Sequence, residues 1–175
     1  WWDECAARGR AAVLFCYALG KAQRLLAELA LQTERLVYLH GALVELTEVY
    51  RAHGVHMLPT EAIAEHPRGK DYAGALVLAP PSAAGSPWMR RFKDAATGFA
   101  SGWMQVRGNR RRRGYDRGFV LSDHADWPAL VQTVRDSGAR RVLATHGSTE
   151  PLVRYLCEQG IAARSLETQF GAEPD

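Results

Sequence analysis

The chain has 175 residues, of which 47% are hydrophobic and 23% are charged, and its formal net charge is +3. This composition is typical of a globular protein rather than a disordered chain, and the length allows one sizeable hydrophobic core or two small ones. The apolar runs are too short, or too often interrupted by polar residues, for a membrane span. We therefore expect a soluble protein without a membrane partner.

Three cysteines lie far apart in apolar stretches: Cys5, Cys16 and Cys157. Their odd number and wide spacing favour reduced thiols in the core over a disulfide framework or a cysteine-based zinc site. Reduced thiols predict a cytoplasmic protein, and the first residues lack the basic head and apolar segment of a signal peptide. Because there is no initiator methionine, we also expect that an upstream segment is missing.

The first hundred residues alternate between apolar strands and amphipathic helices. The predicted helices cover residues 1–9, 24–29, 44–52 and 88–93, and the predicted strands cover residues 11–17, 36–39, 74–79 and 97–104. Gly9 is expected to end the first helix, because glycine readily adopts the left-handed conformation that follows many helices. Strands that alternate with helices predict an α/β domain with a mainly parallel sheet flanked by helices.

The last third of the chain continues this alternation. Strands are predicted over residues 103–107, 118–122, 141–144 and 161–166. An arginine-rich loop joins the first two of these strands. Asp126 is a good N-cap for one helix, which Gly138 ends, and Thr149 is expected to begin a second helix, which Gly160 ends.

The positive charge is concentrated in one short stretch. Six arginines fall within eleven positions: Arg107, Arg110, Arg111, Arg112, Arg113 and Arg117. Such a tract is either a solvated basic hairpin or a surface that binds phosphate groups. Composition alone does not decide between these two interpretations.

Two histidines follow predicted strands and precede predicted helices. We expect His124 and His146 to lie in consecutive β-α units of one sheet, at the edge where ligands bind in open α/β proteins. Imidazole is a good zinc ligand, and Asp123 and Asp126 are close enough in sequence to orient or supplement His124. Two histidines are fewer than the three or four ligands of a zinc site, so polar residues with a purely structural role remain the alternative.

Other residues are candidates for contacts with phosphate or with bases. Gly20 and Lys21 do not form a P-loop, because the motif requires glycine where position 15 is phenylalanine, but Lys21 is expected near the cleft. Ser101 is a candidate phosphate contact, with a turn role as the alternative. Four aromatic residues could stack on unpaired bases, although core packing is the favoured interpretation for each: Trp88, Phe92, Phe99 and Trp103.

Several ordered motifs resemble one superfamily. Residues 118–126, Gly-Phe-Val-Leu-Ser-Asp-His-Ala-Asp, and residues 141–147, Arg-Val-Leu-Ala-Thr-His-Gly, resemble the last two histidine motifs of β-CASP nucleases in the metallo-β-lactamase superfamily. Residues 15–23 resemble the segment that opens the β-CASP insertion. Residues 80–89, residues 100–104 and the arginine tract are similar to the bacterial DNA-ligase-associated exonuclease branch.

This resemblance implies a division of the chain and an activity. Residues 1–104 would form most of a β-CASP domain, and residues 105–175 would form the C-terminal β-α-β-α-β part of a metallo-β-lactamase fold. The implied enzyme is a metal-dependent exonuclease that hydrolyses phosphodiester bonds of DNA during repair. Its expected partners are the DNA substrate, an ATP-dependent DNA ligase and a helicase.

The resemblance also implies roles for individual residues. His124, with Asp126 beside it, takes the place of a catalytic histidine near the scissile phosphate, and His146 takes the place of a ligand to one of two divalent metal ions. These ions would be zinc or manganese. The expected contacts with nucleic acid are Lys21, Ser101, Arg110, Arg111, Arg112 and Arg113. The His-x-His-x-Asp-His motif, which supplies most metal ligands in the superfamily, is absent from this sequence. We expect it upstream of Trp1, so the chain alone should be inactive.

Two other functions remain open at this stage. The superfamily also contains RNA-processing nucleases, of the 3′-end-processing and ribonuclease J types, that share both histidine motifs. A nucleic-acid-binding module without catalytic activity is the alternative from a different class.

Overall fold

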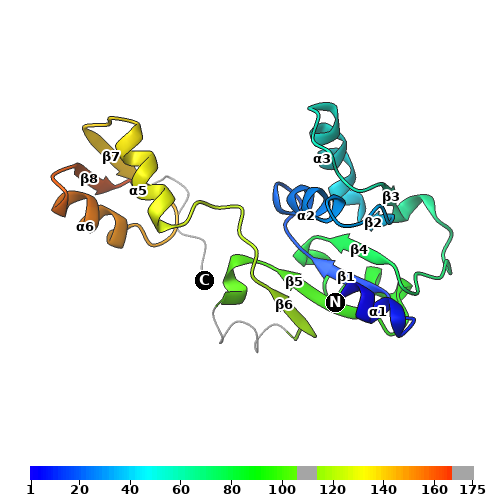
Figure 1. Ribbon diagram of the computed structural model, residues 1–175. Helices are drawn as coiled ribbons and strands as arrows, with labels where there is room; N and C mark the ends of the chain where they lie inside the picture. The colour runs from blue at the N-terminus through cyan, green and yellow to red at the C-terminus, as the bar shows by residue number, and fades with distance from the viewer. Residues whose placement is uncertain (106–113, 167–175) are drawn as a thin grey trace. The chain divides into compact units, whose positions relative to one another are not determined.

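The apolar runs in the first part of the protein form a six-stranded sheet in a computed structural model (Figure 1). The structure describes residues 1–105 and 114–166. The chain divides into two compact units, Trp1–Asp123 and His124–Asp175. The sheet belongs to the first of them.

The sheet of the first unit is parallel throughout, in the order β3-β2-β4-β1-β5-β6. Its strands are β1 (Ala12–Phe15), β2 (Val37–Leu39), β3 (Thr60–Ala62), β4 (Leu76–Ala79), β5 (Ala96–Ala100) and β6 (Arg117–Phe119). Every residue of β1 and β4 is buried, which explains why these central strands are continuous apolar runs in the sequence. The prediction of an α/β fold with a mainly parallel sheet is confirmed.

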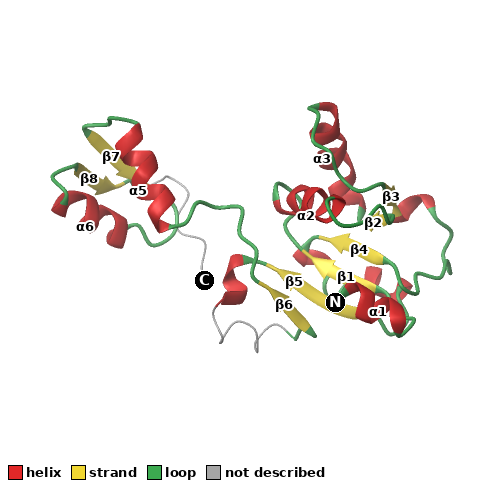
Figure 2. Ribbon diagram, viewed as in Figure 1, coloured by secondary structure: helices red, strands yellow, loops and turns green. Residues whose placement is uncertain are grey.

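The α-helices of the first unit pack on one face of the sheet (Figure 2). They are α1 (Trp2–Ala7), α2 (Lys21–Ala30) and α3 (Gly41–Ala52). Leu26 of α2 and Leu43 of α3 belong to the same buried cluster as Leu14 of β1. As expected, Gly9 follows α1 in a left-handed conformation, with φ of 64°. No described helix has the length and apolar character needed to cross a membrane.

The opposite face of the sheet is covered by loops and by single turns of 3-10 helix. These turns are η1 (Ile63–Glu65), η2 (Pro81–Ala83), η3 (Pro87–Arg91) and η4 (Gly102–Gln105). Phe92 and Met104 pack there against Val13 and Phe15 of β1 in a second buried cluster. The helix predicted over residues 88–93 is therefore the 3-10 turn η3.

Two strand predictions in this unit are corrected by the structure. Residues 103–105 are not the start of a strand, because β5 ends at Ala100 and the chain then turns into η4. Met104, which is 1% exposed, needs this turn to reach the core, and its N–H donates to the carbonyl of Ser101 at 3.0 Å. Edge strand β3 was not predicted, because its three half-buried residues, Thr60–Ala62, have no apolar pattern.

The second unit contains two helices and a short parallel sheet. Its elements are α5 (Trp127–Asp136), β7 (Arg141–Ala144), α6 (Glu150–Glu158) and β8 (Ala162–Ser165). The predicted cap is confirmed, because the Asp126 carboxylate accepts a hydrogen bond from the Ala129 N–H at 2.9 Å. Gly138 and Gly160 follow the two helices with positive φ, as expected.

The expectation that both histidine motifs follow strands of one sheet is wrong. Strand β6, which precedes His124, belongs to the six-stranded sheet, whereas β7, which precedes His146, pairs with β8 in a separate two-stranded sheet. Residue types alone did not distinguish the sheets, because β7 carries apolar residues of the same kind as the buried strands β1 and β4. The names of the two domains and their boundary after residue 104 stay predictions.

Candidate functional site

The carboxyl ends of β1, β5 and β6 bring together the polar residues of the first unit that the sequence singled out. Strands β1 and β5 are neighbours, but β1 continues through α2 to β2 on one side, whereas β5 is followed by β6 on the other side. Such a change of direction opens a crevice at the carboxyl edge of a parallel sheet, where ligands of open α/β proteins bind. We take this edge as the candidate site.

Lys21 and Asp123 form an ion pair at this edge. The distance from the Lys21 Nζ to the Asp123 Oδ1 is 2.9 Å, and the two side chains are 2% and 26% exposed. The ammonium group also lies 4.8 Å from the centre of the Tyr17 ring. Burying the Lys21 ammonium without a carboxylate partner would cost free energy, and Asp123 supplies that partner. The ion pair also connects the first turn of α2 with the segment that follows β6.

Gly20 is required where α2 begins. Its φ is 78°, and a Cβ at this position would lie 2.9 Å from the Asp123 Oδ2. A second bond holds the same segment, because Arg24 Nη1 donates to the carbonyl oxygen of Ser122 at 2.6 Å. The start of α2 therefore fixes residues 122 and 123, which directly precede His124 in the sequence.

Ser101 lies at the end of β5 and is 1% exposed. Its N–H donates to the carbonyl of Phe119 at 3.0 Å, and its Oγ accepts from the Trp103 N–H at 3.3 Å. The first bond holds the ends of β5 and β6 together, and the second gives Ser101 the turn role that the sequence left open. Its contact with a phosphate group stays a prediction.

The buried side chain of Gln23 supports the loop between β1 and α2. Gln23 is 1% exposed, and its Nε2 donates to the carbonyl of Ala18 and to the Thr47 Oγ1 at 3.0 and 3.2 Å.

Burial raises the pKa of the Cys16 thiol to about 12, although the charge of Lys21 acts in the opposite direction. Cys16 is therefore a protonated core residue and not a nucleophile at neutral pH.

The other cysteines differ in burial. Cys5 is buried, as the sequence indicated, but Cys157 is exposed, so the prediction of a core position is wrong for Cys157. Its Sγ donates to the carbonyl of Ala163 at 3.4 Å, which places the thiol against the backbone of β8. All three described cysteines are free.

The catalytic and metal-binding candidates lie in the second unit and are exposed. The carboxylate of Asp126 caps α5, His124 lies in the loop that precedes α5, and His146 lies in the loop between β7 and α6. His146 has an unusual backbone conformation, with φ of 68°, and Gly147 beside it has the same value. Non-glycine residues in this region are uncommon and are enriched at functional sites.

The described residues do not by themselves complete a metal site. No group of three or more His, Cys, Asp or Glu side chains within residues 1–105 and 114–166 is arranged to hold a metal ion. Arg107 and the four predicted contacts Arg110, Arg111, Arg112 and Arg113 lie outside the described residues. Arg117, at the end of the tract, pairs with Glu4 at 3.1 Å on the surface.

Comparison with known proteins gives one extended similarity. No family model matches the chain. The chain is 34% identical over 157 residues to a protein of Opitutus terrae named "Probable DNA ligase". The aligned region covers 88% of this chain but about 15% of that protein, so the chain is similar to one part of a much longer polypeptide.

Proposed function

We propose that this chain is part of a metal-dependent DNA exonuclease of the metallo-β-lactamase/β-CASP superfamily that works with an ATP-dependent DNA ligase. The observation that carries the proposal is the similarity over 88% of the chain to a stretch of a protein named as a probable DNA ligase. The region of similarity is large enough to include most of the motifs that resemble the ligase-associated exonucleases. A nuclease that trims DNA ends would prepare the substrate that a ligase joins.

The geometry of the first unit supports a role at a phosphodiester bond. Lys21 and Arg24 place two cationic side chains at the carboxyl edge of the sheet, and both hold the segment that leads to His124. In the proposed enzyme, His124 donates a proton to the oxygen that leaves the phosphate, a role that imidazole can perform near neutral pH. Lys21 and Asp123 act as positioning residues, because Lys21 is too deeply buried to meet a substrate directly.

Metal ions belong to the proposal through the resemblance alone. His146 is the proposed ligand, and the described residues supply no complete set of ligands around it. When bound, two metal ions would activate water and stabilise charge on the phosphate. The remaining ligands would have to come from a His-x-His-x-Asp-His segment in the full-length protein.

Matched substrates test the proposed function. The full-length protein that carries this sequence is incubated with zinc or manganese and with single-stranded DNA or RNA of one sequence, both labelled at one end. We expect progressive loss of nucleotides from DNA and little change in RNA, and loss of the activity in a His124→Gln variant. Strong cleavage of RNA with intact DNA would favour an RNA-processing nuclease. Binding without cleavage of either strand would favour a non-catalytic module.

The arginine tract provides a separate test of DNA binding. Replacing Arg110, Arg111, Arg112 and Arg113 by glutamine should weaken binding and flatten its dependence on salt, because each lost phosphate contact lowers the slope by about 0.7 for a single strand. An unchanged salt slope would mean that these arginines form a solvated basic surface and do not contact phosphate groups.

A further inference from the structure

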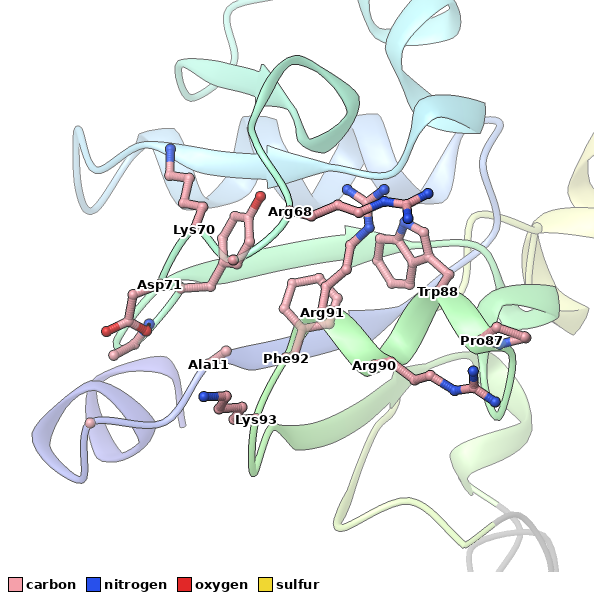
Figure 3. A pocket seen from close by; sticks show the side chains of 14 residues that line it. Ala11, Arg68, Lys70, Asp71, Pro87, Trp88, Arg90, Arg91, Phe92 and Lys93 are labelled. Atoms are coloured by element: carbon pink, nitrogen blue, oxygen red, sulfur yellow. Dashed lines mark hydrogen bonds between the residues drawn. The ribbon is translucent and has the colours of Figure 1, made fainter.

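A basic cavity of about 760 Å³ lies on the face of the first unit that carries the 3-10 turns (Figure 3). Its walls come from the segments that precede β1, β4 and β5, including residues 68–73 and 87–93. The lining residues do not include those of the candidate site described above, which follow the carboxyl ends of β1, β5 and β6. The volume is within the range of small-ligand pockets, roughly 300 to 1,000 Å³.

Positive charge dominates the cavity. Five of its lining residues are cationic and only Asp71 is acidic: Arg68, Lys70, Arg90, Arg91 and Lys93. The Asp71 carboxylate accepts a hydrogen bond from the Ala73 N–H, so it is used within its own turn. Clustered cations in a concave surface raise the local concentration of anions.

Most of these cations have no carboxylate partner among the described residues. Lys70 is the exception, with its Nζ 3.8 Å from the Glu61 carboxylate and 4.4 Å from the centre of the Tyr38 ring. Arg91 donates to a backbone carbonyl, that of Ile63, at 3.3 Å. No ion pair with a described residue engages Arg68, Arg90 or Lys93. In Figure 3 the side chains of Arg68 and Arg91 extend to the same side of the cavity as Trp88.

Trp88 gives the cavity an aromatic wall. The ring is half-buried and makes edge contacts with Phe92 at 4.9 Å and with His40 at 4.8 Å between centroids. These contacts hold the indole in place, so stacking a planar group on it would cost little side-chain entropy. Phe92, by contrast, is buried in the core, as the sequence interpretation favoured.

We propose that this cavity binds a short stretch of single-stranded nucleic acid, with one unpaired base on Trp88 and the phosphates of neighbouring nucleotides on Arg68, Arg90 and Lys93. Rigid aromatic surfaces interleaved with cations are the arrangement by which proteins hold unpaired strands. An acidic peptide would satisfy the cations but would make no use of the indole. The proposal needs no metal and no hydrolysis, so it stands apart from the proposed nuclease activity.

Binding of labelled oligothymidylate to the complete 175-residue chain in EDTA tests the charge contribution. The triple variant Arg68→Ala, Arg90→Ala, Lys93→Ala should bind at least tenfold more weakly, and its salt slope should fall by about 2 if each cation meets one phosphate. The control removes three exposed arginines of the second unit, Arg135, Arg140 and Arg154, and should change affinity less than threefold. Equal losses of affinity in the two triple variants would mean that the cavity is not the binding site, and the proposal would fail.

Variants of the indole test the stacking contribution. Trp88→Ala should weaken binding about tenfold, as expected for one lost base contact, whereas Trp88→Phe should retain most of the affinity. Thermal unfolding of each variant checks that the fold is intact. If Trp88→Ala folds and binds like the parent chain, the base does not stack there and the proposal fails.

Photochemical crosslinking locates the binding site, and competition shows whether its ligand is a nucleic-acid strand or a free nucleotide. An oligothymidylate that carries 5-iodouracil should crosslink to the peptide that contains Trp88, and a crosslink confined to other peptides would overturn the assignment. Thymidine monophosphate should compete only at concentrations far above those of the oligonucleotide. Equal competition would overturn a strand as the ligand in favour of a free nucleotide, and equal competition by inorganic phosphate would overturn base recognition.

Discussion

The two units of the protein differ in how completely they bury their sheets. In the first unit every residue of β1 and β4 is buried, with clusters of apolar side chains on both faces. In the second unit, β7 has one buried residue, Ala144, and β8 has none. Leu143 and Trp127 are 39% and 43% exposed. A two-stranded sheet rarely supplies enough buried area for independent stability, so the same alternation of strands and helices gives units of unequal stability.

The largest expected difference is in the cooperativity of unfolding of the two units when each is made as a separate fragment. Residues 1–123 as an isolated fragment should unfold in one cooperative transition, because its sheet is covered on both faces. Residues 124–175 alone should retain helix signal but show no cooperative transition. Circular dichroism during urea unfolding of the two fragments measures this. A sharp transition in the shorter fragment would contradict the comparison.

Matched leucine substitutions sharpen the comparison at single residues. Leu78→Ala in β4 removes a side chain that is 0% exposed and should cost about 2 to 5 kcal/mol. Leu143→Ala in β7 removes a side chain that is 39% exposed and should cost about 1 kcal/mol or less. Native-state hydrogen exchange, which reads the unfolding free energy of each unit separately, would show the difference. Equal losses would mean that β7 is as well packed as β4.

Removing either partner of the Lys21–Asp123 ion pair should lower the free energy of unfolding, but by different amounts. Asp123→Asn leaves the Lys21 ammonium buried without a carboxylate and should destabilise the first unit by about 3 kcal/mol. Lys21→Met replaces the cation with an apolar side chain of similar length, and the remaining Asp123 carboxylate is partly exposed, so the cost should be about 1 kcal/mol. Urea unfolding of both variants gives the two values. The reverse order would show that Lys21 is stabilised by groups other than Asp123.

The smallest expected effect is a pH dependence in the first unit. Burial, and to a lesser extent the charge of Arg91, lowers the pKa of His40 from its ordinary value of 6.5. The unfolded chain therefore binds a proton before the folded chain does, and stability falls as the pH decreases from 6.5 toward the lowered value. His40→Asn should keep the cap that His40 Nδ1 provides for the Ala42 N–H, and should lose less stability between pH 7 and about 5.5. An identical loss in parent and variant would exclude His40 as the cause.

Burial also decides how much of the fold could be predicted from the sequence. Strands β1 and β4 are buried on both faces, so their continuous apolar runs were sufficient to identify them. Edge strand β3 has no such run, and η4 carries the apolar Met104 into the core by a turn that resembles a strand in sequence. Local patterns also could not separate the two sheets, because strand pairing is a long-range property of the chain.

The candidate site was predictable in its parts but not in its contacts. The sequence placed Lys21 near a cleft and drew attention to Asp123, yet nothing in local spacing indicated that the two would form an ion pair. The buried positions of Gln23 and Thr47 were missed for the same reason, since both residues depend on the packing of α2 against α3. The left-handed backbone of His146 is a property that composition and periodicity do not reveal.

The most direct test of the proposed nuclease compares metal content and DNA hydrolysis in two variants of the full-length protein. His146→Ala should lose bound metal and activity together, because His146 is the proposed ligand. His124→Ala should retain most of the metal but lose turnover, because His124 is the proposed proton donor. Elemental analysis alongside an exonuclease assay measures both quantities. A His146→Ala protein with unchanged metal content and full activity would contradict the account.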